Sequence, residues 1–272
     1  MHTWRWQTWN GLPYLTCSLL ESFAHGFFNR TFWPQKPQDL VRILHPIATV
    51  HRVKQVHGNT ILTPSEIRHT NLAAVPTGSA SPSAVEFDLP PADGLLTEAP
   101  EQAAWVCSAD CNPILIADQV MGQVAAVHAG WRGTAMKIAP VAIARLQAQG
   151  SQIKHLRIAM GPAIAGEVYQ VSHQVAAEVA ATIVPTGQFE TADALFDHLQ
   201  QIDHPPLLPD PRPGRCRLDV RRINSLQLEQ IGITTEQIAI APHCTYQEPQ
   251  HFFSYRRTHE KKVQWSGIVS RA

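Results

Sequence analysis

Residues 107–133, CSADCNPILIADQVMGQVAAVHAGWRG, constrain the fold of this chain more than any other stretch. Two apolar runs, residues 114–117 and 124–127, lie on either side of a short turn around Met121 and Gly122. We predict a β-hairpin there, because short apolar runs separated by a glycine-containing turn are typical of paired strands. The hairpin gathers three chemically reactive side chains at one edge: Asp110, Cys111 and His128.

Composition limits the class of ligand. The chain has 272 residues, 44% of them hydrophobic, which is enough for a substantial core. Lys and Arg together number 22, as do Asp and Glu, so no basic field favours nucleic acid or a membrane surface. We therefore expect a small-molecule ligand.

The five cysteines are odd in number and widely scattered, which favours a reducing compartment over a disulfide framework. The first ten residues lack the pattern of a signal peptide, and no apolar run approaches transmembrane length. The expected location is the cytoplasm.

Short apolar runs elsewhere predict further strands. Residues 4–9 carry Trp4, Trp6 and Trp9, whose rings we expect to lie on the core. In the run at residues 23–28, His25 is expected to be a hydrogen-bonded core residue. Other strands are expected at residues 93–96, 156–160, 238–241 and 263–269, and two strand pieces are expected within 51–62, broken at His57 and Gly58.

Apolar residues at helical spacing predict four helices. One covers residues 37–44, and a second lies within 134–149 with a start later than Thr134, because Pro140 is tolerated only near a helix start. A third runs from an Asp219 N-cap to a Gly232 C-cap. The fourth is indicated by an apolar face made of Val171, Val175, Val179 and Ile183.

Two stretches are predicted to be loops. Residues 73–92 are rich in proline, serine and alanine, and the five prolines in residues 204–214 exclude regular structure. Strands and helices alternate without the regular rhythm of a doubly wound sheet. We therefore expect a mixed α+β fold, organised as a single domain over residues 1–272.

Three residues could hold a metal ion: His57, Cys111 and His128 each lie at a strand end or beside a glycine. Three nitrogen and sulfur ligands with an open fourth position make a catalytic zinc site, although their irregular spacing also suits separately buried side chains. The glycine-rich turn at residues 130–133 leads into a helix and carries Arg132. That turn could bind an anion such as phosphate, or be an ordinary strand-to-helix connection.

The chain also resembles a known family. Six strings carry the resemblance in this order: KQVHG (54–58), ADG (92–94), SADCNPIL (108–115), VHAGWRG (127–133), GPAI (161–164) and FFSYRR (252–257). They are similar to those of the family variously named laccase-domain protein, polyphenol oxidase and purine nucleoside phosphorylase. The resemblance spans most of the chain from His25 onward.

The resemblance implies a four-layer α/β/β/α fold and a zinc ion held by His57, Cys111 and His128. It also implies phosphorolysis of purine nucleosides to free base and ribose 1-phosphate, with deamination of adenosine to inosine. Asp110 and Arg132 are the expected catalytic residues, although Asp110 could instead cap backbone N–H groups. The expected substrate-binding residues lie in the matching motifs: Gln55, Asn112 and Arg256.

Two departures from the family bear on this transfer. Glu167 and Val168 stand before Tyr169 where many members carry a cysteine pair, and FNRTFWPQKP replaces a glycine-rich segment. Two rival functions stay open. One is a copper-dependent polyphenol oxidase with Met121 or Met136 as a weak axial ligand, and the other is an amidase acting on peptidoglycan precursors through Cys111 and His128. The oligomeric state is left open.

Overall fold

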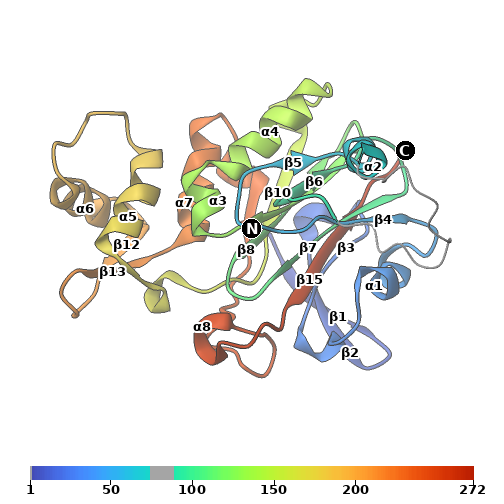
Figure 1. The fold of residues 1–272 in the computed structure, drawn as a ribbon, viewed down its shortest axis with the longest axis horizontal. Helices are drawn as coiled ribbons and strands as arrows, with labels where there is room; N and C mark the ends of the chain where they lie inside the picture. Colours follow the sequence, from blue (N-terminus) through green and yellow to red (C-terminus); the bar gives the residue numbers. More distant parts are fainter. Residues whose placement is uncertain (1, 74–88) are drawn as a thin grey trace.

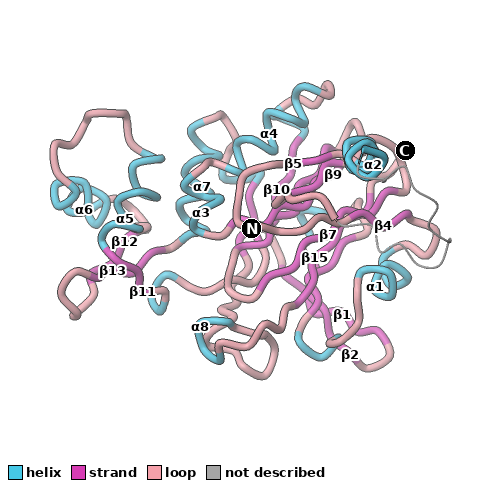
Figure 2. Tube along the Cα trace, in the orientation of Figure 1, coloured by secondary structure: helices cyan, strands magenta, loops and turns pink. Residues whose placement is uncertain are grey.

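Two six-stranded sheets form the centre of the molecule (Figures 1 and 2). The computed structural model describes residues 2–73 and 89–272. The first sheet has the order β1 (Trp4–Trp9), β2 (Leu12–Cys17), β3 (His25–Phe28), β15 (Gln264–Val269), β7 (Gln102–Ser108) and β4 (Thr49–His51). The second has the order β14 (Ile238–Ile240), β10 (Leu156–Met160), β8 (Asn112–Asp118), β9 (Val124–Ala129), β6 (Gly94–Leu96) and β5 (Ile61–Leu62).

The predicted α+β fold with mixed sheets is confirmed. In both large sheets most neighbouring strands are antiparallel, whereas β4 runs parallel to β7, β5 to β6, and β14 to β10. One hydrophobic cluster joins the two sheets, with Phe27 and Val106 from one packed against Leu115 and Ala126 from the other. The sheets therefore form the two inner layers.

Helices cover the outer faces of the two sheets. Helix α1 (Pro37–Leu44) packs on the first sheet around Trp105, and α4 (Ile138–Ala148) and α7 (Val220–Gln230) pack on the second around Ile116 and Ile158. Together these layers give the expected α/β/β/α order. No helix among the described residues is long and apolar enough to cross a membrane.

A smaller unit extends from one end of the layers (Figure 1). A three-stranded sheet, in the order β11 (Gln170–Ser172), β13 (Arg215–Leu218) and β12 (Leu207–Pro209), packs with α5 (His173–Ala180) and α6 (Ala192–Gln201). Its hydrophobic cluster also contains Val220 of α7 and Trp131 of α3 (Trp131–Ala135). This unit thus adjoins the end of the hairpin where Cys111 lies.

Several predicted elements are confirmed with their local causes. Helix α1 covers the predicted residues. At the start of α7 the Asp219 side chain accepts a hydrogen bond from Arg222 N, as expected of an N-cap. The same helix ends just before Gly232, whose φ of 93° is in the left-handed region that favours glycine. Helix α4 begins only at Ile138, so Pro140 lies in its first turn. His25 is buried, and its ring is hydrogen-bonded to Cys17 N and Phe23 O, as expected of a core histidine.

Other predictions are wrong in part. Trp6 and Trp9 are exposed rather than packed on the core, because β1 is an edge strand, and only Trp4 packs against the central cluster. The proline-rich stretch at residues 204–214 was predicted to lack regular structure but contains strand β12. The loop predicted to be exposed at residues 73–92 ends in Ala92, which is buried, and residues 74–88 lie outside the described part of the chain. Val171 belongs to β11 rather than to the following helix, and α2 (Pro64–Ala73) was not predicted.

Candidate metal centre

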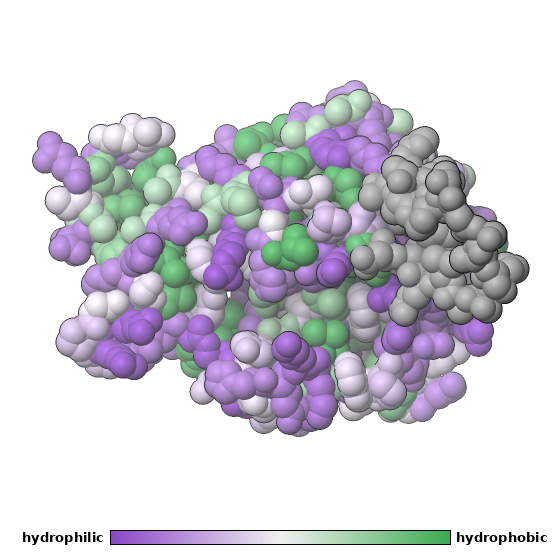
Figure 3. Space-filling model, in the orientation of Figure 1, coloured by the Kyte–Doolittle hydropathy of each residue, from purple (hydrophilic) through white to green (hydrophobic). Residues whose placement is uncertain are grey.

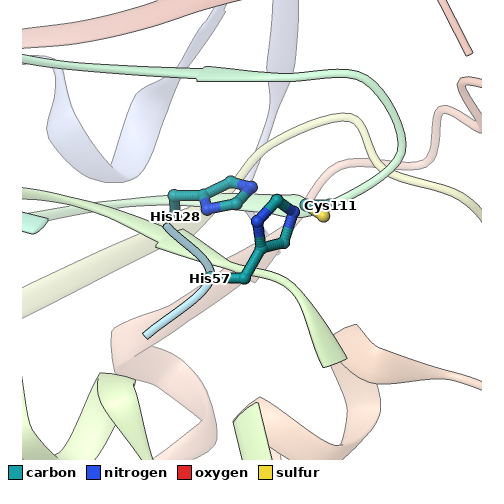
Figure 4. Close-up of side chains that lie close together, drawn as sticks. All are labelled: His57, Cys111 and His128. Carbon is teal, nitrogen blue, oxygen red and sulfur yellow. The ribbon is translucent and has the colours of Figure 1, made fainter. Parts of the chain in front are cut away.

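Three side chains from separate segments converge at one end of the β8–β9 hairpin (Figure 4). Each of His57, Cys111 and His128 offers one ligand atom, and these atoms all lie within 4.8 Å of one another. The His57 and His128 rings are 5.0 Å apart between centroids, at an interplanar angle of 80°. Among the residues that the structure describes, this is the one group of three or more such side chains.

The hairpin register explains how two of the three ligands meet. Asn112 pairs with Ala129, so Cys111 just before β8 lies opposite the end of β9, close to His128. His57 comes from the connection between β4 and β5 and has φ 63°, a left-handed conformation that costs free energy in a residue other than glycine. Its side chain is exposed, whereas that of His128 is buried. The centre is therefore open to ligands from the His57 side.

A glycine keeps the space between the ligands free. A Cβ atom on Gly130 would lie 2.9 Å from Cys111 Sγ and 3.3 Å from His57 Cδ2. Thus any larger residue would press on two of the three ligand side chains. The open space and the sulfur and nitrogen donors suit a tetrahedral metal that uses three protein ligands and one exchangeable position.

A fully buried carboxylate, Asp93, supports the ligands from behind. It accepts a hydrogen bond from His128 Nδ1 at 2.9 Å and from the backbone N–H groups of Val56, His57 and Gly58 at 3.1, 2.9 and 2.6 Å. Burial raises the pKa of Asp93, but the hydrogen bonds from His128 and Gly58 outweigh that effect and hold it below its ordinary value. Asp93 is thus a carboxylate at neutral pH.

The ligand side chains are strongly polarised by one another. Burial raises the pKa of the Cys111 thiol, but the imidazoles of His128 and His57 outweigh it and bring the pKa to about 6. Burial lowers the pKa of His128, whereas Cys111 and Asp93 raise it to about 9. Cys111 is therefore a thiolate at neutral pH, which is the form of cysteine that ligates metals.

Asp110 connects the centre to α8 (Tyr255–Thr258). Its carboxylate accepts a hydrogen bond from Thr245 Oγ1 at 2.7 Å and another from Arg256 N at 2.7 Å. Both oxygens are thus engaged, in keeping with the capping role that the sequence left open. The Arg256 guanidinium is fixed in turn, because its Nη1 donates to Gln170 O at 2.7 Å.

Two arginines stack on aromatic rings near Cys111. The Arg256 guanidinium lies 4.8 Å from the centroid of the Tyr169 ring, and that of Arg132 lies 4.4 Å from that of Trp131. Burial raises the pKa of Tyr169 to about 12, Cys111 adds to this rise, and both arginines oppose it. The Tyr169 hydroxyl therefore lies within the electrostatic reach of both arginines and of the Cys111 sulfur.

Gln55 and Asn112, the two other expected substrate-binding residues, differ in how their amides are engaged. The Gln55 amide pairs with the Cys107 backbone, accepting from its N at 2.8 Å and donating to its O at 2.7 Å. Asn112 is buried and lies next to Cys111 in sequence, but strand alternation turns its side chain to the opposite face of β8, where Ile114 lies. Neither of its amide atoms has a hydrogen-bond partner among the described residues.

Sequence reasoning missed the supporting roles of Asp93, Tyr169 and Trp131. Asp93 was visible only as an acidic residue between Ala92 and Gly94, at the start of a buried strand. Burial of an acid at such a position is a signal for a hydrogen-bonded role, because an isolated buried carboxylate is costly. Nothing in the local pattern indicated its partners.

The family model described as multi-copper polyphenol oxidoreductase laccase matches residues 37–270. This chain belongs to that family. A relative named purine nucleoside phosphorylase, from Synechocystis sp., is 52% identical to this chain over 267 residues. The match covers 98% of this chain and 97% of the relative. The adenosine deaminase RL5, from an unknown prokaryotic organism, is 30% identical over 165 residues, covering 61% and 56%.

Solved structures show the same fold. YlmD from Geobacillus stearothermophilus has a TM-score of 0.76 at 23% identity, covering 98% of this chain and 99% of its own. The Bacillus licheniformis protein YfiH has a TM-score of 0.73 at 23% identity, covering 95% and 96%. The layered architecture of this laccase-family chain is thus shared over nearly its full length.

Proposed function

We propose that this chain is a zinc-dependent purine nucleoside phosphorylase. It would cleave adenosine, inosine or guanosine with phosphate to the free base and ribose 1-phosphate, and deaminate adenosine as a side activity. The observation that carries the proposal is the convergence of His57, Cys111 and His128 at one end of the hairpin. Two arginines, Arg132 and Arg256, stack on Trp131 and Tyr169 close by in the fold. The Synechocystis relative named purine nucleoside phosphorylase, 52% identical over nearly the whole chain, supports the same reaction.

The donor set fits a zinc site with three protein ligands and does not fit a multicopper cluster. A blue-copper site of two histidines and a cysteine adds a weak axial methionine. Of the two candidate methionines, Met121 lies in the turn at the far end of β8 from Cys111, a seven-residue strand about 20 Å long, and so cannot serve as that ligand. Met136 follows α3 with an exposed side chain, and its backbone O accepts a hydrogen bond from Asn59 Nδ2, two residues after His57. A multicopper cluster would need further histidine groups, and the described residues offer one group only.

The residues around the centre have distinct proposed roles. Bound zinc would supply Lewis-acid chemistry. Arg132 and Arg256 would hold phosphate and stabilise its negative charge, and Asp110 would fix Arg256 through its backbone N–H. Gln55, with its amide fully engaged on Cys107, would shape the pocket by fixing the end of β7 rather than contact the nucleoside directly.

The departure at residues 28–37 lies close to the proposed phosphate side. Arg30 stacks on Phe253 at 4.9 Å from the ring centroid, and the Trp33 ring contacts the same phenylalanine edge-on at 5.8 Å. Phe253 leads directly into α8, which carries Arg256. Substrate range is therefore the property in which this chain would differ most from relatives that have a glycine-rich segment there.

A paired assay tests the proposed function. The protein is purified without added metal, its zinc and copper contents are measured, and adenosine is supplied with and without phosphate. We expect about one zinc per chain and phosphate-dependent release of adenine and ribose 1-phosphate. Copper together with phenol oxidation would favour the oxidase instead. Amide hydrolysis that persists after zinc removal, without any phosphorolysis, would favour the Cys111–His128 amidase.

Arg132→Ala should raise the phosphate KM by about 10- to 100-fold with a smaller effect on the nucleoside KM, because a charge-assisted hydrogen bond to an anion is lost. The check is a pair of titrations, each at saturating levels of the other substrate. Arg271→Ala is the matched control, since Arg271 also stacks on an aromatic ring, Phe23, away from the centre. An unchanged phosphate KM removes Arg132 from the anion site.

A further inference from the structure

One carboxylate receives four hydrogen bonds from two segments that are far apart in sequence. Asp93 Oδ1 accepts from His57 N and His128 Nδ1, while Oδ2 accepts from Val56 N and Gly58 N. Asp93 is fully buried, so no solvent competes for these bonds. Its own backbone is also fixed, because its N donates to Thr60 O at 2.9 Å and its O accepts from His128 N at 2.7 Å.

The bonds to residues 56–58 act on the conformation of His57. At φ 63° His57 occupies the left-handed region, which a β-carbon disfavours and which the surrounding structure must impose. Three successive backbone N–H groups directed at one carboxylate supply that constraint. Without them the connection between β4 and β5 could relax to an extended conformation, and the His57 ring would leave the space beside Cys111.

The bond to His128 acts on its tautomer. With Nδ1–H donated to Asp93 Oδ1, Nε2 is the nitrogen that faces the other ligands and would give up its proton to bind a metal. The same oxygen accepts from His57 N, so one atom fixes the backbone of one histidine and the ring of the other. A displacement of this carboxylate would therefore disturb both ligands together.

We propose that Asp93 is a positioning residue that sets both histidine ligands of the metal centre. This inference rests on the metal-binding part of the proposed function and is independent of which nucleoside is cleaved. Asp93 would contact neither metal nor substrate, and would act only through His57 and His128.

Zinc affinity of the full-length Asp93→Asn variant tests the proposal. The asparagine amide keeps the volume of the side chain but places an N–H₂ donor where two bonds need an acceptor. We expect the zinc dissociation constant, measured by competition with a chelating dye, to rise by about 10- to 100-fold. A folded Asp93→Asn protein with wild-type zinc affinity overturns the inference.

Asp118→Ala is the matched control for a loss of general stability. Asp118 is also a fully buried aspartate that accepts two backbone hydrogen bonds, from Val120 N at 2.8 Å and Met121 N at 2.9 Å. It lies at the end of β8 that is remote from Cys111. Because both bonds are accepted by Oδ1, which alanine lacks, we expect Asp118→Ala to lower thermal stability but to keep wild-type zinc affinity. An equal loss of affinity in both variants assigns Asp93 a merely structural role and overturns the inference.

Nuclear magnetic resonance on the zinc-free wild-type chain gives a readout that needs no folded variant and no activity. We expect the amide protons of residues 56–58 to exchange about 10-fold or more slowly than exposed loop amides, because Asp93 accepts them without metal. The ¹⁵N shifts of His128 in the zinc-loaded chain should report a protonated Nδ1. Freely exchanging amides overturn the proposal, even if Asp93→Asn fails to fold. A wild-type chain that binds no zinc refutes the metal-dependent function, and slow exchange at residues 56–58 would then show only that Asp93 fixes the backbone of His57.

Discussion

Cys111→Ala is expected to lower both the zinc affinity and the kcat/KM of nucleoside phosphorolysis, each by at least ~1,000-fold. Loss of a direct ligand should exceed the 10- to 100-fold cost typical of losing an outer hydrogen bond to a ligand. Cys111 is also the thiolate whose charge balances the neighbouring imidazoles, so its removal leaves His57 and His128 without their anionic partner. Zinc content and kcat/KM for adenosine check the expectation.

Two further variants test whether the Cys111 thiol acts as a zinc ligand or as a catalytic nucleophile. Cys107→Ala should keep both zinc and activity, because only the backbone of Cys107 pairs with Gln55 and burial raises the pKa of its thiol to about 12. Cys111→Asp should recover part of the zinc affinity, since a carboxylate can ligate zinc but cannot replace a thiolate nucleophile. If Cys111→Ala keeps its zinc and loses only an amide-hydrolysing activity, the thiol is a nucleophile and not a ligand.

The parts of the site that sequence predicts are those encoded by short-range pattern. The apolar runs of the hairpin fix the pairing of β8 with β9, and that pairing brings Cys111 to His128. Arg132 follows in the next turn and is placed by the same local sequence. His57 was identified only by residue type beside a glycine, because the contact that brings it to Cys111 depends on the order of strands in the second sheet.

Asp93 could not be assigned its role from sequence for a related reason. Its partners lie 35 to 37 residues away on both sides, at Val56, His57, Gly58 and His128, and no periodicity links them. Its bonds exist because β6 pairs with β9 and with β5, so the start of β6 lies between the two histidines. Only the assembled sheet contains that information.

The misassigned elements also have physical explanations. Pro209 is compatible with a strand because β12 lies at the edge of its sheet, where a missing N–H need not break the ladder. Trp6 is exposed, yet its ring meets that of His243 edge-on at 5.3 Å between centroids and that of His251 in a tilted arrangement at 5.1 Å. Alternation alone predicts a strand, but not whether a neighbouring layer covers it.

Gly130→Ala should weaken zinc binding by about 10- to 100-fold, a far larger effect than its effect on the stability of the zinc-free protein. The backbone of Gly130 has φ −73° and ψ 171°, a conformation that alanine adopts freely. On this ground alone the substitution should stabilise the chain by about 0.4–1 kcal/mol, because alanine restricts the unfolded state. The added methyl group, however, would lie 2.9 Å from Cys111 Sγ and force that ligand to move.

The unequal size of the two effects makes this variant diagnostic, because in the zinc-free chain the backbone gain of alanine offsets part of the cost of moving Cys111. A substitution that merely damages packing lowers stability and zinc affinity together, whereas Gly130→Ala should separate them. Thermal unfolding of the zinc-free chain and dye competition for zinc measure the two quantities on the same preparation. Wild-type zinc affinity in Gly130→Ala would mean that the metal lies away from the space between Cys111 and His57. The three side chains would then be neighbours in the fold without forming one centre.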